Sequence, residues 1–319
     1  MLFQKWWFIR SILKYGSPVI SFLEKPGIEK HGADQPENPC VFIIGPPRSG
    51  STIVYQIITS LLNVSYMDNL ANLARYNPYF GLRLSQRLYP TRSHKSYTSN
   101  FGQTSKDGLH APAEALFFYK WFPKDRHYTE LSDLSPDQLS EFRQTVYAMI
   151  NQSNRALVIK NLSFSLRLQV LKEVIPGARY IVVRRNPLYT VQSLLQAMRK
   201  SNVPEDKVWG ILPKDFKMLE GLDLYEKVVK QVNLIEKQIY NDLKSMPEEN
   251  ILYIDYEKLG TVLELVMGEV MTLCGPGVKR RPTVPLPEIS VKNRINLPEE
   301  EIEILKSHIQ PLDWELQNS

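Results

Sequence analysis

The sequence predicts an α/β fold, a three-layer sandwich with a central parallel sheet and a P-loop-like phosphate-binding turn. Four short apolar runs indicate strands that are covered on both faces, because they lack the polar alternation of half-exposed strands. Helical patterns separate these runs, and strands that alternate with helices form parallel sheets through right-handed crossovers. The runs span residues 40–45, 156–160, 179–184 and 251–256.

The first 39 residues are predicted to form an aromatic and basic helix followed by a linker, ahead of a main domain at 40–319. Residues 1–23 are aromatic and apolar, but Lys5, Arg10 and Lys14 interrupt them, so no run is long enough to span a bilayer. Two interpretations stay open: a helix that lies in a membrane interface, and a helix that packs on the protein's own surface. Residues 24–39 are polar and contain Pro and Gly, which is typical of a linker.

The turn after the first predicted strand has most of a Walker A motif. Gly45, Gly50 and Thr52 occupy the positions that G-x-x-x-x-G-K-[ST] requires, but Ser51 stands where the motif has lysine. A glycine turn that opens a helix presents backbone N–H groups at the positive end of the helix dipole, which favours anions. We therefore expect an anion to be held by Arg48, Ser49, Gly50, Ser51 and Thr52.

The first helix is predicted over 51–62, and Ser135 before Pro136 marks the start of a later one. Residues 162–177 and 224–243 also carry helical patterns, and the second of these has an apolar face formed by Val228, Val232, Ile235 and Ile239. Residues 63–135 show no clear strand. We therefore expect a largely helical insertion between the first and second recognisable strands.

Part of this insertion, residues 69–106, contains basic residues and no acidic one. Such a run is either a solvated surface or a positive wall beside an anionic ligand. The basic residues are Arg75, Arg83, Arg87, Arg92, Lys95 and Lys106.

The composition is that of an ordinary globular protein, with 43% hydrophobic and 23% charged residues and a formal net charge of +5. The two cysteines, Cys40 and Cys274, are too few for a disulfide framework and fit a reducing compartment. We expect a cytoplasmic protein that becomes peripheral on the inner membrane face if its first helix binds lipid. Neither a metal ion nor a nucleic-acid partner is predicted.

Cationic residues end the second and third predicted strands, at Lys160 and at Arg184-Arg185. A nucleotide kinase would instead place a Mg²⁺-holding aspartate at such a strand end. This pattern favours a site in which lysine and arginine, in place of a metal ion, hold an anionic donor.

The segment "PPRSGST" (46–52) resembles the 5′-phosphosulfate-binding loop of the PAPS-dependent sulfotransferases, PAPS being 3′-phosphoadenosine 5′-phosphosulfate. "YIVVRRNPLYTVQSLL" (180–195) is similar to the family's 3′-phosphate motif, in which a strand-end arginine precedes a serine by eight residues, here Arg185 and Ser193. Residues 157–187 and 251–259 resemble the bacterial-type branch. The resemblance runs from about Cys40 to Cys274 and is weak over 63–110.

The resemblance implies transfer of a sulfuryl group from PAPS to a hydroxyl or amine acceptor, with PAP as the product. Arg48 and Lys160 are the candidates for stabilising charge on the leaving phosphate. In the cytosolic branch a histidine base lies two residues after the strand lysine, but this chain has Leu162 there. Glu114 is our preferred base, because the aromatic run after it is expected to desolvate the carboxylate partly. His110 is the runner-up, because histidine changes charge near neutral pH.

Two alternatives to a sulfotransferase are a P-loop nucleotide kinase, disfavoured by Ser51, and a non-catalytic membrane-associated scaffold with a nucleotide-binding fold. For the acceptor, the basic segment 69–106 indicates an anionic molecule such as an acidic glycan or glycolipid. The aromatic N-terminus indicates a lipid-linked one.

Overall fold

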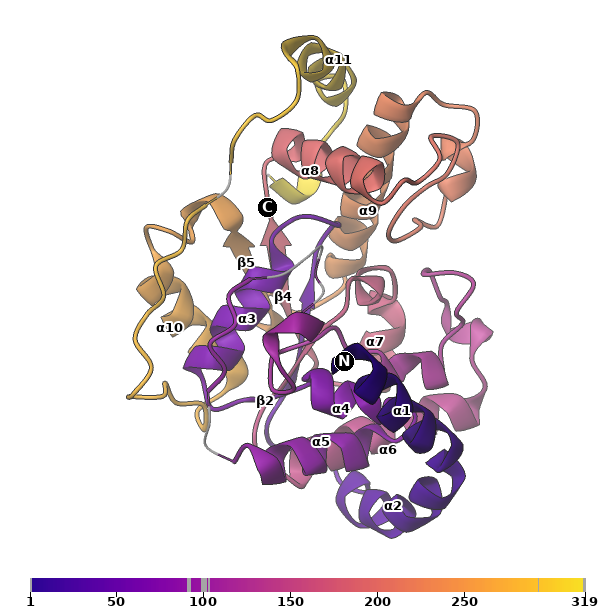
Figure 1. Ribbon diagram of the computed structural model, residues 1–319, viewed down its shortest axis with the longest axis vertical. Coiled ribbons are helices and arrows are strands. Elements are labelled where there is room, and N and C mark those ends of the chain that lie inside the picture. Colours follow the sequence, from indigo (N-terminus) through magenta and orange to yellow (C-terminus); the bar gives the residue numbers. More distant parts are fainter. Residues whose placement is uncertain (1, 91–92, 99–101, 103, 292, 318–319) are drawn as a thin grey trace.

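The computed structural model describes residues 2–90, 93–98, 102, 104–291 and 293–317 (Figure 1). Its centre is a parallel sheet of five strands in the order β2-β3-β1-β4-β5. The α/β class with a parallel central sheet is therefore confirmed. The strands are β1 (Cys40–Ile44), β2 (Ser65–Tyr66), β3 (Leu157–Lys160), β4 (Arg179–Arg184) and β5 (Ile251–Asp255).

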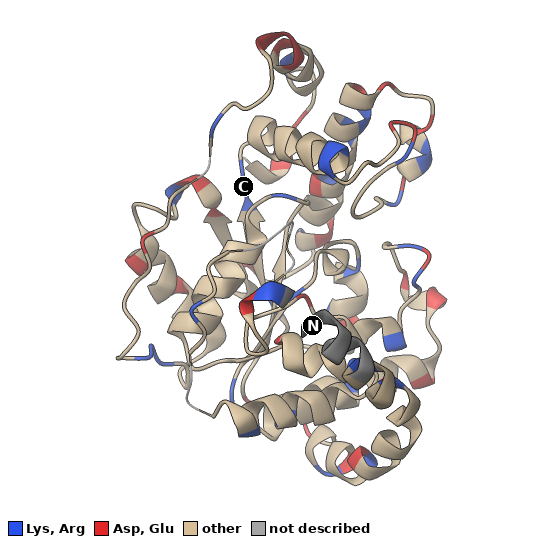
Figure 2. Cartoon of the chain, viewed as in Figure 1, with Lys and Arg blue, Asp and Glu red and all other residues tan. Residues whose placement is uncertain are grey.

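Helices cover both faces of the sheet. Alternate residues of a strand point to opposite faces, so each strand contributes side chains to two cores. Phe42 and Ile44 of β1 face a core formed with α6 (Pro136–Asn151), α7 (Leu168–Val174) and α9 (Leu224–Leu243). Val41 and Ile43 face the opposite core, formed with α3 (Ser51–Leu61) and α10 (Leu263–Cys274). In Figure 2 the strands are mostly tan, and the charged residues lie mainly on the surrounding helices and loops. The three layers agree with the prediction.

A smaller third core lies beside the sheet. There α8 (Pro187–Lys200) packs against α9 and α11 (Glu299–Ile309), and Val191, Val228 and Leu305 are fully buried between them. This packing fixes α8, which carries Ser193, relative to the strand that precedes it.

Most predicted elements are present. The four predicted strands are β1, β3, β4 and β5, and α9 has the predicted bounds with its four predicted apolar residues fully buried. Ser135 caps α6 by accepting a hydrogen bond from the backbone N–H of Gln138. Two differences are local: β2 is a two-residue edge strand that gives no periodic signal, and residues 162–177 form a 3₁₀ turn (Leu162–Leu166) before α7.

The insertion over 63–135 is less helical than expected. It contains α4 (Asn69–Leu73) and α5 (Pro78–Leu88), after which the described chain forms loops and three short 3₁₀ turns. These turns are Ser105–Asp107, Phe117–Lys120 and Leu131–Asp133.

Two helices precede the sheet, α1 (Leu2–Tyr15) and α2 (Ser17–Gly32). The linker expected over 24–39 is wrong for 24–32, because this segment continues α2 and packs on the domain. Glu24 is buried and accepts hydrogen bonds from Asn77 Nδ2 and the N–H of Phe80, each at 3.0 Å. A side chain at Gly32 would overlap the backbone carbonyl of Gln144 in α6, so the two helices are in close contact. Among the described residues, no helix combines the length and apolar character needed to cross a bilayer.

The strand order places the site. β1 lies between β3 and β4 in the sheet. After β1 the chain forms β2 and β3 on one side of β1, and it then crosses over to form β4 and β5 on the other side. In parallel sheets ligands bind at such a switch point, outside the carboxyl ends of the strands. The turn after β1, Lys160 at the end of β3 and Arg185 after β4 meet there.

Candidate active site

The turn between β1 and α3 has a backbone that few residues tolerate. Gly50 has a φ of 97°, and a side chain there would overlap the ring of Tyr256. Arg48 also lies in the left-handed region, with a φ of 71°, which is strained for a residue other than glycine. The first hydrogen bonds of α3 are donated by Ile53 and Val54 to the carbonyl of Gly50. By helix geometry, the amides before them point beyond the helix end, where an anion can accept from them.

The turn borders a cavity of about 760 Å³ at the carboxyl edge of the sheet. Four of the five residues predicted to hold an anion line it, namely Arg48, Gly50, Ser51 and Thr52. Ser49 does not line it, because its side chain is fully buried beneath the turn.

Lys160 and Glu114 form an ion pair at one end of this cavity. Lys160 is 2% exposed at the tip of β3, whereas the Glu114 side chain is 37% exposed. Thr52 lies beside the pair: a Cβ built on Gly102 would be 3.5 Å from Glu114 Oε1, 3.6 Å from Thr52 Oγ1 and 3.8 Å from Lys160 Nζ. The three polar groups therefore converge on one small space.

The aromatic run after Glu114 does not enclose its carboxylate as expected. Phe117 and Phe118 are fully buried in the core on the α6 side of the sheet. Lys160, rather than this run, is the principal neighbour of Glu114.

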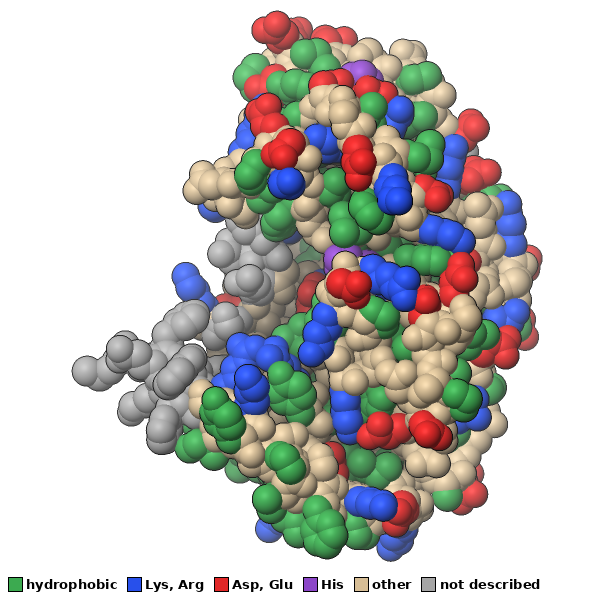
Figure 3. All heavy atoms as spheres, turned by 90° about the vertical axis from the view of Figure 1, so that its right-hand side faces the viewer, with side chains coloured by type: hydrophobic (Ala, Val, Ile, Leu, Met, Phe, Trp, Pro, Cys, Tyr) green, Lys and Arg blue, Asp and Glu red, His purple; other side chains and the backbone are tan. Residues whose placement is uncertain are grey.

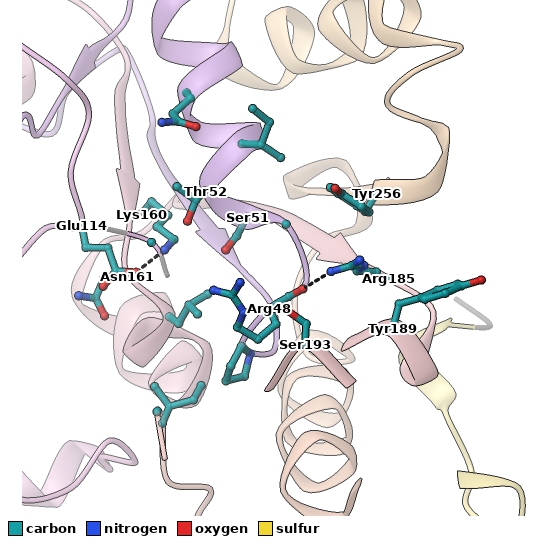
Figure 4. A pocket seen from close by; sticks show the side chains of 18 of the residues that line it. Arg48, Ser51, Thr52, Glu114, Lys160, Asn161, Arg185, Tyr189, Ser193 and Tyr256 are labelled. Carbon is teal, nitrogen blue, oxygen red and sulfur yellow. Dashed lines mark hydrogen bonds and ion pairs between the residues drawn. The ribbon is translucent and has the colours of Figure 1, made fainter. Parts of the chain in front are cut away.

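Arg185 and Ser193 lie at the other end of the cavity (Figure 4). Arg185 Nη1 donates to the backbone oxygen of Arg48 at 3.1 Å, and its guanidinium lies 4.6 Å from the ring centre of Tyr256. Ser193 Oγ accepts from Arg48 Nε at 3.1 Å. In Figure 4, Glu114 and Lys160 lie on one side, Arg185 and Ser193 on the other, and Arg48 between them.

Burial lowers the pKa of the Arg48 guanidinium, and the charge of Arg185 lowers it further. Burial likewise lowers the pKa of Arg185. Arg48 and Arg185 therefore form a site where a bound anion is strongly favoured.

Arg184, the neighbouring strand-end cation, does not line the cavity. It forms an ion pair with Asp255 at 2.7 Å, and Lys258 pairs with the same carboxylate. Asp255 is a strand-end aspartate of the kind that a kinase uses, but it lies on the edge strand β5 and is held by these two cations.

His110 is not among the residues that line the cavity. Its Nδ1 lies 3.0 Å from Asp68 Oδ2, the hydroxyl of Tyr66 lies 3.0 Å from its Nε2, and its ring stacks on Tyr89. The structure thus separates the two base candidates and brings only Glu114 to the cavity.

The expected positive wall over 69–106 is wrong for this cavity. Its described basic residues, Arg75, Arg83, Arg87, Lys95 and Lys106, do not line it, and Arg92 lies outside the described residues. Arg83 instead lies over the ring of Tyr79.

Sequence reasoning missed the segments 288–290 and 293–296, which line the cavity with residues that include Arg294 and Asn296. Asn293 in the second segment accepts from Arg185 Nε and Nη2 at 3.2 and 3.1 Å. Neither segment has a helix or strand period. Arg294 was one available signal in an otherwise unpatterned stretch. Trp209, Tyr189 and Asn161 line the cavity as well.

The fold and the cavity define an α/β protein with a cavity lined by cationic side chains at the switch point of a parallel sheet. The chain belongs to the sulfotransferase family, whose model matches residues 39–278.

Two curated relatives are omega-hydroxy-beta-dihydromenaquinone-9 sulfotransferases Stf3 of Mycobacterium bovis and Mycobacterium tuberculosis. Each is 22% identical over 253 residues, which cover 70% of this chain. The chain spans 63% of the length of these relatives.

Among solved structures, sulfotransferase STF9 from Mycobacterium avium superposes with a TM-score of 0.47 and 16% identity, covering 92% of this chain and 73% of the other. Sulfotransferase STF1 from Mycobacterium tuberculosis gives a TM-score of 0.48 and 10% identity, with 96% and 85% covered.

Proposed function

We propose that the protein transfers the sulfuryl group of PAPS to a hydroxyl or amine of an acceptor. The observation that carries this proposal is the arrangement of one cavity, with Arg185 and Ser193 at one end and Lys160 with Glu114 at the other. A donor that is anionic at both ends matches this cavity. Family membership favours sulfuryl transfer over the nucleotide-kinase alternative.

The two ends of the donor are assigned by charge. The 3′-phosphate lies between Arg185 and Ser193, where a guanidinium and a hydroxyl are already close to Arg48. The 5′-phosphosulfate lies on the turn, with the hydroxyls of Ser51 and Thr52 beside it. This orientation directs the sulfuryl group toward Lys160.

Transfer is an in-line displacement. The acceptor oxygen attacks sulfur, the bond from sulfur to the 5′-phosphate oxygen breaks, and PAP leaves with that electron pair. Lys160 and Arg48 stabilise the negative charge that develops on the leaving oxygen. Glu114 receives the acceptor's proton.

The ion pair between Glu114 and Lys160 connects these two roles. When the donor is bound, its leaving oxygen attracts the Lys160 ammonium, and the carboxylate becomes available to the acceptor. The pair therefore holds both groups in place before the substrates arrive.

We further propose that the acceptor is lipid-linked and is taken from a membrane surface. Apolar side chains of α1 and α2 recur every three or four residues and are exposed, Phe22 to 77% and Leu23 to 70%. The other exposed members of this series are Ile9, Ile12, Tyr15 and Val19. Arg10 and Lys14 lie in the same helices, a combination suited to the interface of an anionic bilayer. The curated relatives are named for a hydroxylated menaquinone, which is compatible with a lipid hydroxyl as acceptor.

Incubation of the full chain with radiolabelled PAPS and a membrane-lipid extract tests the proposal. Label is expected in a lipid product, and PAP is expected to raise the melting temperature because it binds only the folded protein. A protein that PAP stabilises without transferring label would have the donor site of a non-catalytic scaffold. Absence of any stabilisation by PAP would contradict the donor assignment.

A further inference from the structure

A second cavity, of about 220 Å³, adjoins the first. It shares Leu116 and Tyr119 with the first cavity, so an apolar and an aromatic side chain form the common boundary. Its lining consists of Arg75, Tyr76, Leu116, Tyr119, Lys120 and Lys124.

The position of the second cavity relative to Glu114 is fixed by one side chain. Asn72 Nδ2 donates to the backbone oxygen of Glu114 at 2.8 Å, and Asn72 Oδ1 accepts from the N–H of Leu116 at 3.2 Å. These bonds attach α4 to the segment that carries the proposed base. Arg75 lies two residues after the end of α4, so its place is set by the same attachment.

The second cavity is strongly basic. Three of its six lining residues are cations, and none of the six is a carboxylate. Lys120 pairs with Glu141 at 2.7 Å, which offsets part of its charge and fixes its ammonium group. Lys124 and Arg75 add two further positive charges on the same wall.

The positive charges affect the hydroxyl of Tyr76, which lines the same cavity. Arg75 Nη2 donates to the hydroxyl of Tyr76 at 3.2 Å and its guanidinium lies 5.1 Å from the ring centre. This hydrogen bond lowers the pKa of Tyr76, and the charges of Arg75, Lys124 and Lys14 lower it further. Lys14 belongs to α1, and α1 packs against α4, the helix just before Arg75. Figure 3 shows basic side chains gathered beside hydrophobic ones next to a hollow in this face of the molecule.

We propose that the second cavity binds an anionic group of the acceptor, a phosphate or a carboxylate, and that an apolar chain passing Leu116 and Tyr119 joins it to the hydroxyl at Glu114. This inference rests on the proposed function of the first cavity and names the class of acceptor: an amphiphile with a hydroxyl at a distance from an anionic group. The two shared side chains contact the apolar part, and Arg75, Lys120 and Lys124 contact the anion.

Calorimetric titration of the full chain, loaded with PAP to fill the donor site, tests the inference. The probes are decyl phosphate, below the concentration at which it forms micelles, and decanol as the uncharged control. We expect decyl phosphate to bind at least about tenfold more tightly than decanol, the effect of one charge-assisted bond. The double variant Arg75→Ala/Lys124→Ala should lose this preference, whereas Lys217→Ala should keep it, because Lys217 is exposed and lines neither cavity.

Further measurements distinguish an anionic group of the acceptor from a lipid headgroup as the anion that binds in the second cavity. Arg75→Lys keeps the charge and should retain most of the preference. The inference is overturned if the double variant binds decyl phosphate as the wild type does, or if inorganic phosphate binds as tightly as decyl phosphate. It is also overturned if the double variant and the wild type bind decyl phosphate in solution equally well and differ only in binding to phosphatidylserine vesicles. The cations would then recognise a lipid headgroup. The affinity for PAP, measured in the loading step, reports on the donor site separately.

Discussion

The Nε of Arg48 donates a hydrogen bond to the Oγ of Ser193 at 3.1 Å, although 145 residues separate the two in the chain. Arg185 in turn donates to the backbone oxygen of Arg48 at 3.1 Å. The turn after β1 and the motif after β4 are therefore one unit, in which each part helps to hold the other. A substitution in either part is expected to affect both.

Gly50→Ala is expected to destabilise this unit. Gly50 has a φ of 97°, and an added methyl group would overlap the ring of Tyr256, so both backbone strain and a steric clash oppose alanine. We expect a loss of about 2–4 kcal/mol in the free energy of unfolding, together with weaker PAP binding. Urea denaturation and calorimetry measure the two effects.

Gly268→Ala is the matched control. Gly268 lies within α10, and nothing is within 4 Å of an added Cβ. Alanine there should stabilise the protein by about 0.4–1 kcal/mol and leave PAP binding unchanged. Equal effects of the two substitutions would show that the geometry of Gly50 has no special importance.

The sequence predicted the sheet and the turn well because their signals are local. Apolar runs identify buried strands, and the spacing of glycines identifies the turn. The spacing of eight residues from Arg185 to Ser193 could also be recognised, through its resemblance to the 3′-phosphate motif of the sulfotransferases.

The rest of the site depends on contacts between distant segments. Nothing near Asn293 in the sequence shows that it reaches Arg185, and the ion pair of Lys160 with Glu114 joins residues 46 positions apart. The continuation of α2 through Pro26 was missed for the same reason. Its stability comes from packing on α6 and from the buried hydrogen bonds of Glu24, and not from local propensity.

Glu114→Gln is expected to lower kcat by about 10²–10⁴-fold, the usual effect of losing one acid–base group, while PAP affinity stays near that of the wild type. The amide oxygen of glutamine can still accept from Lys160, so the fold should be retained. Turnover of radiolabelled PAPS measures kcat, and calorimetry with PAP measures the affinity.

His110→Asn is the comparison for this prediction. His110 is bonded to Asp68 and Tyr66 and does not line the cavity, so its replacement should cost less turnover. If His110→Asn abolishes turnover while Glu114→Gln stays active, the base has been assigned to the wrong residue.

Phe22→Ser/Leu23→Ser is expected to reduce co-sedimentation with anionic liposomes without lowering the melting temperature, because both side chains are largely exposed on α2. Met218→Ser removes a comparably exposed apolar side chain, 62% exposed, from another region and should have no effect on sedimentation. If wild-type protein stays in the supernatant with liposomes present, the exposed series is not a membrane contact.

Glu236 is expected to contribute a loss of stability as the pH rises from about 4.5 to about 8. Burial raises the pKa of Glu236 from 4.5 to about 8, and its Oε1 accepts a hydrogen bond from Gln317. Between these values the folded protein keeps the proton and the unfolded chain loses it, so rising pH favours unfolding. Glu236→Gln should flatten this part of the profile in urea denaturation at several pH values. An unchanged slope would show that another group causes the dependence.

The central claim is that Arg185 and Ser193 recognise the 3′-phosphate of a PAPS-type donor, and calorimetric titration with PAP and with AMP tests it most directly. AMP has the same adenosine and 5′-phosphate but lacks the 3′-phosphate. We expect wild-type protein to prefer PAP. Arg185→Ala and Ser193→Ala should each weaken PAP binding by about 1.5–3 kcal/mol per lost charge-assisted bond and affect AMP much less. Equal losses for PAP and AMP, or no preference for PAP in the wild type, would contradict the account.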